Sequence, residues 1–162
     1  MGPLDLPRLA GAWLPVVAWV AVIGQLGGDG FSEPTTRGAF IPLLEWLLPW
    51  LTEEAREALS WTLRRAAHPG IYGVLALLTW RALARTAPAT PRNRSLALTL
   101  GTSLLVALAD EGRQAQSLVR DGSLIDVGLN LAGALVAAAG VAAAERRRGR
   151  PFFAPLPDSP QT

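Results

Sequence analysis

Cysteine and lysine are absent from this chain of 162 residues, and histidine and tyrosine each occur once. The absence of cysteine excludes disulfides and thiolate metal sites. Because arginine supplies all 15 basic residues, the lack of lysine is typical of a GC-rich genome rather than of one function. The sequence also has no internal repeat and no glycine-rich phosphate loop, and no nucleic-acid partner is expected.

The chain is instead rich in long apolar blocks. Half of its residues are hydrophobic, and they gather at residues 11–28, 66–84, 95–109 and 124–144. A helix that crosses a bilayer needs about 20 residues, a length that the third block reaches only when it is extended to 96–114. Backbone that faces lipid is helical or closed into a barrel. We therefore predict an all-α polytopic membrane protein with a bundle of four transmembrane helices, in preference to a soluble bundle with buried core helices.

The first block is expected to remain as a membrane span rather than to be cleaved as a signal peptide. The residues before it include both Asp5 and Arg8, instead of the clearly positive region that a signal peptide needs. Residues 24–30 also form a poor small-residue cleavage site.

The placement of the arginines predicts the orientation. Arginines precede the first span, surround the loop between the second and third spans, and follow the fourth span: Arg8, Arg81, Arg85, Arg92, Arg94, Arg146, Arg147, Arg148 and Arg150. The loop between the first and second spans is acidic instead, with Asp29, Glu33, Glu45, Glu53, Glu54 and Glu57. The positive-inside rule then places both termini and the middle loop in the cytoplasm.

The first loop is predicted to contain an interfacial or re-entrant segment. Residues 38–51 are apolar, but Pro42 and Pro49 interrupt them and they are too short to span a bilayer. Tryptophan is typical of side chains that anchor at headgroup level, and the loop contains Trp46, Trp50 and Trp61.

Two helix starts and one domain boundary are also predicted. Thr52 is placed to cap a helix whose first turn holds two glutamates, and Ser123 is placed to cap the fourth span. Residues 146–162 are rich in proline and arginine and too polar to form a core. We expect them to be a disordered cytoplasmic tail after a transmembrane domain of residues 1–145.

Polar side chains gather at one predicted end of three spans. They are Arg64, Arg65, His68 and Tyr72 at the start of the second span, Asp110, Glu111 and Gln114 at the end of the third, and Arg120, Ser123, Asp126 and Asn130 at the start of the fourth. With both termini inside, these span ends all lie at the outer leaflet. An ionised group inside a span costs roughly 2.5–3.5 kcal/mol unless it pairs or faces a cavity. We therefore expect these polar residues to converge at one membrane face, with His68, Glu111, Arg120, Asp126 and Asn130 in one outer-leaflet cavity.

The spacing of these residues supports the prediction. Asp126 and Asn130 lie four residues apart and so share one helix face, and His68 and Tyr72 have the same spacing. Pro69 removes a helical hydrogen bond and is expected to kink its helix, with His68 at the bend. The alternative is a structural role for each group, as an interfacial histidine, snorkelling arginines and ordinary ion pairs.

These residues resemble the motif pattern of the VanZ-like family. The pattern comprises Arg65-Ala66-Ala67-His68 followed by Tyr72, then Asp110-Glu111 with Gln114, then Arg120-x-Gly122-Ser123-x-x-Asp126-Val127-x-x-Asn130-x-x-Gly133. Members are small integral membrane proteins of bacteria, named for one that is linked to resistance to the glycopeptide antibiotic teicoplanin. The resemblance, which covers residues 12–144, implies a multi-pass protein of the bacterial cytoplasmic membrane that acts in the cell envelope.

The first functional hypothesis is an outer-leaflet site for a lipid or glycan precursor that carries phosphate, such as an anionic lipid or a polyprenyl phosphate. Arg65 and Arg120 would clamp the phosphate, a task suited to guanidinium groups. Any chemistry would be hydrolysis or transfer at phosphate, with His68, Glu111 and Asp126 as the candidate catalytic groups. The remaining candidate ligand-binding residues are Tyr72, Asp110, Gln114, Ser123 and Asn130.

The second hypothesis is a non-enzymatic assembly or accessory subunit of a larger membrane complex. The polar residues would then hold the bundle together, and the small residues of the fourth span would pack against neighbouring helices. These small residues are Gly128, Ala132, Gly133, Ala139 and Gly140. In such a complex His68 would be able to ligate a pigment metal supplied by a partner. No two of the candidate residues show a recognised Mg²⁺ or Zn²⁺ spacing, so no cofactor is assigned.

The predicted topology can be tested by cysteine labelling, because the chain has no cysteine of its own. We expect an impermeant thiol reagent added outside intact cells to label Ser32→Cys and to leave Asn93→Cys and Gln161→Cys unlabelled until the membrane is permeabilised. External labelling at position 93 would contradict the orientation and the convergence of the three polar groups.

Overall fold

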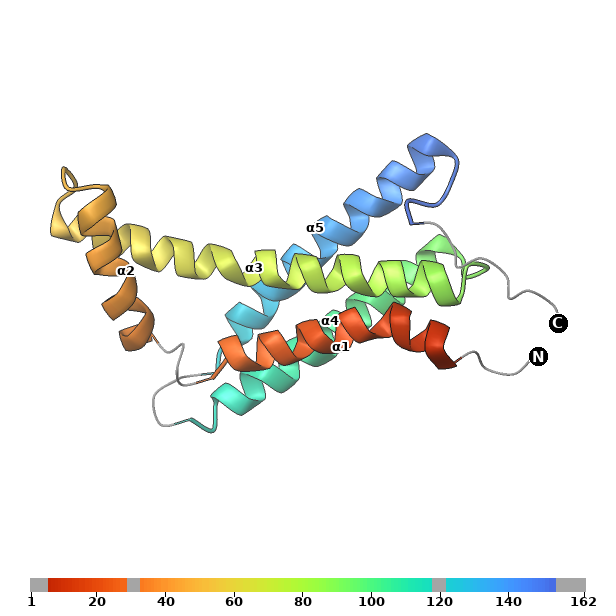
Figure 1. The fold of residues 1–162 in the computed structure, drawn as a ribbon, viewed down its shortest axis with the longest axis horizontal. Helices are drawn as coiled ribbons and strands as arrows, with labels where there is room; N and C mark the ends of the chain where they lie inside the picture. The colour runs from red at the N-terminus through yellow and green to blue at the C-terminus, as the bar shows by residue number, and fades with distance from the viewer. Residues whose placement is uncertain (1–5, 29–32, 118–121, 154–162) are drawn as a thin grey trace.

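The computed structural model describes residues 6–28, 33–117 and 122–153. Five helices follow one another in these ranges: α1 (Leu6–Leu26), α2 (Glu33–Leu47), α3 (Glu53–Thr86), α4 (Arg92–Gln114) and α5 (Leu124–Arg148) (Figure 1). No strand occurs among the described residues. The predicted all-α class is therefore confirmed.

Three of the described helices are long and apolar enough to cross a membrane. The candidate spans are Leu9–Leu26 in α1 and the whole of α4 and α5. They indicate a multi-pass membrane protein. The second predicted span, residues 66–84, lies in α3 and is not among the three. It includes His68 and Arg81, which lower its hydropathy, and the predicted count of four spans therefore stays a prediction.

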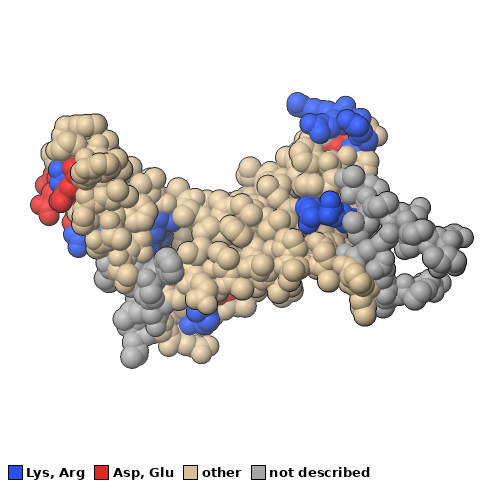
Figure 2. Space-filling view, in the orientation of Figure 1, with Lys and Arg blue, Asp and Glu red and all other residues tan. Residues whose placement is uncertain are grey.

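The surface of the candidate spans is apolar, while part of the interior is polar. Val17 of α1, Leu105 of α4 and Val136 of α5 are 62%, 70% and 74% exposed, whereas Thr99 and Ser103 are fully buried. Soluble proteins rarely expose large apolar patches. Most of the charged surface lies toward the two ends of the long axis, and the middle is largely uncharged (Figure 2). This distribution suits helices that face hydrocarbon.

The central helix is α3, which packs against each of the other four helices and most extensively against α5. Because α3 faces protein on several sides, it needs less apolar surface than a helix that faces lipid. It approaches α5 closely at Gly133, where an added Cβ would collide with the carbonyl oxygen of Pro69. The helix continues through Pro69 rather than ending there, so His68 lies within one continuous helix.

Chain direction alternates between the long helices. The start of α1, the end of α3 and the end of α5 lie toward one end of the bundle, and the end of α1, the end of α4 and the start of α5 lie toward the other (Figure 1). We call the second of these the polar end, because His68, Glu111 and Asp126 lie there. The first is the arginine-rich end, with Arg92 and residues 146–148.

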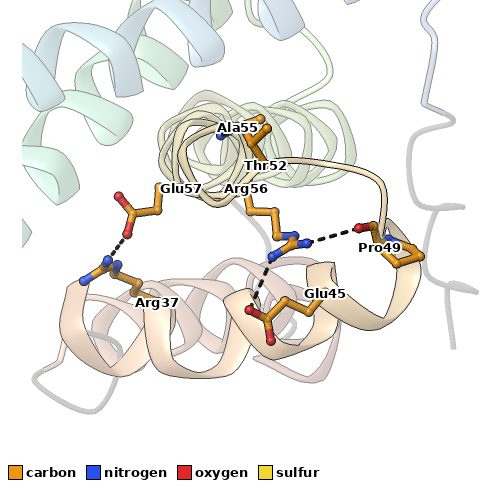
Figure 3. A network of polar contacts seen from close by, with 7 residues as sticks. All are labelled: Arg37, Glu45, Pro49, Thr52, Ala55, Arg56 and Glu57. Carbon is orange, nitrogen blue, oxygen red and sulfur yellow. Dashed lines mark hydrogen bonds and ion pairs between the residues drawn. The ribbon is translucent and has the colours of Figure 1, made fainter.

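A helical hairpin of α2 and the first part of α3 extends beyond the polar end (Figure 1). Among the described helices, the backbone of α2 approaches only α3. Arg37 of α2 pairs with Glu57 of α3, and Arg56 of α3 pairs with Glu45 of α2 at 3.4 Å (Figure 3). Opposite charges on facing helix surfaces thus hold the hairpin together.

The segment that the sequence predicts to be interfacial or re-entrant forms most of α2. The helix includes Pro42 and ends at Leu47, before Pro49. Trp46 and Trp50 are 78% and 74% exposed. Large exposed aromatic side chains are typical of the headgroup level of a bilayer.

Both predicted helix caps are confirmed. Thr52 accepts a hydrogen bond from the Ala55 N–H at 3.3 Å at the start of α3. Ser123 accepts one from the Asp126 N–H at 3.4 Å at the start of α5. Each cap satisfies a backbone donor that the first turn of a helix leaves unpaired.

The described start of the predicted tail is folded. Helix α5 continues to Arg148, and Gly149 then turns the chain in the left-handed conformation, with φ of 65°. Phe153 packs beside Trp80 of α3 and Val141 of α5. Residues 154–162, the rest of the predicted tail, lie outside the described residues.

The close contact of α3 and α5 makes position 133 sensitive to size. Gly133→Ala places a methyl group against the Pro69 carbonyl, and we expect a loss of about 1–3 kcal/mol in the free energy of unfolding, as for other overpacked sites. Gly140→Ala is the control in the same helix, because nothing lies within 4 Å of a Cβ added at that position. Thermal unfolding in detergent measures both variants. Equal melting temperatures would contradict the proposed contact.

Candidate functional site

The polar end encloses a cavity of about 290 Å³ between α1, α2, α3 and α4. Apolar side chains form much of its wall: Ile23, Leu26, Phe40, Leu63 and Ile71. Its polar lining comes from Thr36, Arg64, His68, Tyr72, Asp110 and Gln114. Residues of the first and second predicted polar groups thus line the same cavity.

Glu111 joins the end of α4 to the start of α5. It is 5% exposed, and its Oε2 atom accepts a hydrogen bond from the Ser123 N–H at 2.9 Å. His68, Asp110 and Asp126 all lie within electrostatic range of its carboxylate. The structure therefore brings residues of all three predicted polar groups together around one buried carboxylate.

Asp126 has a cationic partner on another helix. The Arg65 Nη2 atom lies 3.5 Å from Asp126 Oδ1, and the Arg65 guanidinium also lies over the Trp61 ring, 4.9 Å from its centroid. Arg65, predicted to clamp a phosphate, is thus engaged in an ion pair in this structure. Arg120, the other predicted clamp, lies outside the described residues.

Asp110 is held by two neighbours on its own helix. Its Oδ1 atom accepts a hydrogen bond from Arg113 at 3.0 Å, and its Oδ2 atom accepts one from Gln114 at 2.9 Å. Arg113 also donates to the Gly24 carbonyl of α1 at 2.8 Å. Gly27 permits this approach, because a Cβ added there would collide with the Asp110 carboxylate. The acid at the end of α4 is thereby tied to α1.

Four side chains at the polar end have buried atoms without a hydrogen-bond partner. These atoms are the Tyr72 hydroxyl, Glu111 Oε1, Asp126 Oδ1 and both side-chain polar atoms of Asn130. Tyr72 is 2% exposed and Asn130 is fully buried. A buried polar atom that is left unpaired costs about 1–3 kcal/mol, and native proteins keep few of them. Such a cluster is typical of a place that a ligand or bound water completes.

The described site provides acid–base groups but no recognisable metal centre. His68 and Glu111 are close enough to interact electrostatically, and both side-chain types carry protons in catalysis. Among the described residues, no three His, Asp or Glu side chains are arranged to hold a metal ion.

Part of the cavity lining was not predicted from the sequence. Thr36 of α2 lines the cavity, and its hydroxyl accepts a hydrogen bond at 3.1 Å from Nη1 of Arg64, a member of the first predicted polar group. Phe40 of α2 also lines the cavity. In the sequence, these residues are marked only by two threonines, Thr35 and Thr36, that precede an apolar segment. Their position beside α3 depends on the hairpin, which the sequence does not reveal.

A second polar cluster, also not predicted, lies at the arginine-rich end. Glu145 of α5 is 7% exposed and accepts hydrogen bonds from Trp80 at 3.2 Å, from Arg92 at 3.4 Å and from the Phe152 N–H at 3.1 Å. It ties α5 to α3, to α4 and to the segment after α5. The only sequence signal for it was a single acid at the arginine-rich end of the fourth apolar block.

The ion pair of Asp126 with Arg65 leads to a prediction about stability. Because the Arg65 side chain is 42% exposed, we expect a double-mutant cycle of Arg65→Ala and Asp126→Asn to give a coupling energy below about 1 kcal/mol but above zero. The matched cycle of Arg120→Ala with Asp126→Asn should give none. Melting in detergent measures both cycles. A larger coupling for position 120 would show that Arg65 is not the main partner.

Comparisons with known proteins identify no relative of this chain. No protein-family model matches it, and neither a curated protein nor a solved structure does. The resemblance to the VanZ-like family therefore stays a prediction from the motif residues.

Proposed function

We propose that the chain is a VanZ-like integral membrane protein of the bacterial cytoplasmic membrane, with both termini in the cytoplasm and the polar end at the outer leaflet. Its cavity recognises the headgroup of an envelope lipid, or lipid-linked glycan precursor, that carries phosphate. The observation that carries the proposal is the combination, in one cavity, of apolar walls with Arg64, His68 and Tyr72. A lipid has the matching parts, because its charged headgroup suits the polar side chains and its acyl chains suit the apolar walls.

The position of the cavity along the helices supports a lipid ligand. Leu26, which ends the candidate span of α1, and Gln114, which ends α4, both line the cavity. The ends of membrane spans lie at headgroup level. The hairpin of α2 and the first part of α3 also exposes Trp46 and Trp50, a residue type that is typical of membrane–water interfaces.

The arginines and the acid–base residues have different proposed roles. Arg64 supplies a guanidinium inside the cavity, and the motif adds Arg65 and Arg120 as further phosphate contacts. The proposed function is binding of the headgroup, with or without a reaction at its phosphate. Hydrolysis would use His68 and Glu111 to move protons between the attacking water and the leaving group, and cleavage of a phosphate ester bond in the bound lipid would be its sign.

A second candidate function is supported by the outer face of α5. Gly128 and Gly140 have no atom within 4 Å of an added Cβ, and Ala132 and Ala139 are exposed. Small residues let membrane helices approach closely. An accessory subunit would use this face to pack against a partner helix, and a stoichiometric membrane partner would then copurify with the protein.

The proposed function predicts that phosphate is needed for lipid binding. Purified protein in detergent should bind at least one bacterial phospholipid, phosphatidylethanolamine or phosphatidylglycerol, more tightly than diacylglycerol with the same chains, as measured by native mass spectrometry. Arg64→Ala should weaken the tighter interaction about tenfold, equivalent to about 1.4 kcal/mol.

Arg94→Ala is the matched control, because Arg94 is an exposed arginine at the start of α4, at the opposite end of the bundle. It should leave the affinity unchanged. Equal binding of phospholipids and diacylglycerol, or an Arg64→Ala variant that binds like the parent protein, would contradict the proposed function.

A further inference from the structure

The cavity at the polar end carries fixed charges of both signs. Arg64 and Asp110 line the same space of about 290 Å³. A purely anionic headgroup would be attracted by the guanidinium and repelled by the carboxylate. A headgroup that carries a phosphate and its own cation would meet a complementary charge at both places.

The carboxylates of the polar end are not all matched by cations. Asp110 pairs with Arg113 at 3.0 Å, and Asp126 pairs with Arg65 at 3.5 Å. Glu111 is 5% exposed and forms no ion pair with any described residue. Its Oε1 atom also lacks a hydrogen bond. A cationic donor from a ligand would give Glu111 both an ion pair and a hydrogen bond to its Oε1 atom.

Tyr72 lines the cavity and interacts electrostatically with Glu111. Its hydroxyl is buried without a hydrogen-bond partner, and the residue lies within electrostatic range of both Asp110 and Glu111. Tyr72 and Asp110 both line the cavity. A ligand with several N–H donors at this wall would meet carboxylate and phenol oxygens together.

We propose that the cavity binds a zwitterionic aminophosphate headgroup, with the phosphate toward Arg64 and a primary ammonium toward Asp110, Tyr72 and Glu111. The inference rests on the proposed function and narrows its ligand from any phosphate-bearing lipid to one with a primary amine. The apolar wall, which includes Leu26 and Phe40, covers the beginning of the acyl chains.

The test compares three phospholipids with identical acyl chains, using full-length protein in detergent and native mass spectrometry. Phosphatidylethanolamine has a primary ammonium, phosphatidylcholine has a quaternary ammonium without N–H donors, and phosphatidylglycerol has no cation. We expect phosphatidylethanolamine to bind at least tenfold more tightly than either of the others. Free phosphoethanolamine, added as a competitor, should displace the lipid only weakly. Strong displacement would support the aminophosphate chemistry and identify the source as a soluble ligand.

A charge-removing variant tests the role of the unpaired carboxylate. Glu111→Gln keeps an oxygen that accepts from the Ser123 N–H, so it should fold, and it should reduce the preference for phosphatidylethanolamine over phosphatidylglycerol about tenfold. Glu54→Gln, an exposed position in the first turn of α3, should keep the preference. If Glu111→Gln fails to fold, Asp110→Asn replaces it with the same expectation.

The outcomes separate this inference from the proposed function. Equal binding of the three phospholipids, with diacylglycerol still excluded, would overturn the inference and leave the proposed function standing. A preference that survives both carboxylate variants would also overturn it. Failure to bind any of the three would overturn both proposals.

Discussion

A carboxylate held among apolar helices must be offset by cations, hydrogen bonds or a ligand, and this constraint organises both ends of the molecule. At the arginine-rich end, Glu145 receives three hydrogen bonds from protein donors. At the polar end, Glu111 receives one, from Ser123. The two acids are almost equally buried. The saturated acid therefore acts as a tie between helices, while the unsaturated one lies at the end of the bundle where we propose that a ligand binds.

The fold is divided into a tightly packed helix bundle and a projecting hairpin. The tight α3–α5 contact at Gly133 and the ties at Glu145 fix a compact core. The hairpin of α2 and the first part of α3 projects beyond it and is held by charge pairs such as that of Arg37 with Glu57 (Figure 3). Because Thr36 and Phe40 of this hairpin line the cavity, the site combines residues of the helix bundle with a wall from the hairpin.

Much of the architecture could be predicted from the sequence because lipid simplifies the problem. Apolar blocks and two side-chain caps were enough to predict the helical class, several spans and the starts of α3 and α5. The co-localisation of His68, Glu111 and Asp126 followed from helix direction alone. Pairing could not be predicted in the same way: Asp126 pairs with Arg65 across two helices, and that choice depends on how the helices rotate against each other.

The central claim is that the cavity between α1, α2, α3 and α4, at the ends of membrane spans, is a headgroup site. A cryo-electron microscopy structure of the protein in nanodiscs made with phosphatidylethanolamine tests it most directly. We predict headgroup density in the cavity within hydrogen-bonding distance of the Tyr72 hydroxyl, with His68, Glu111 and Asp126 on the same side. An empty cavity closed by its own side chains, with Glu111 and Asn130 paired to each other, would contradict the account.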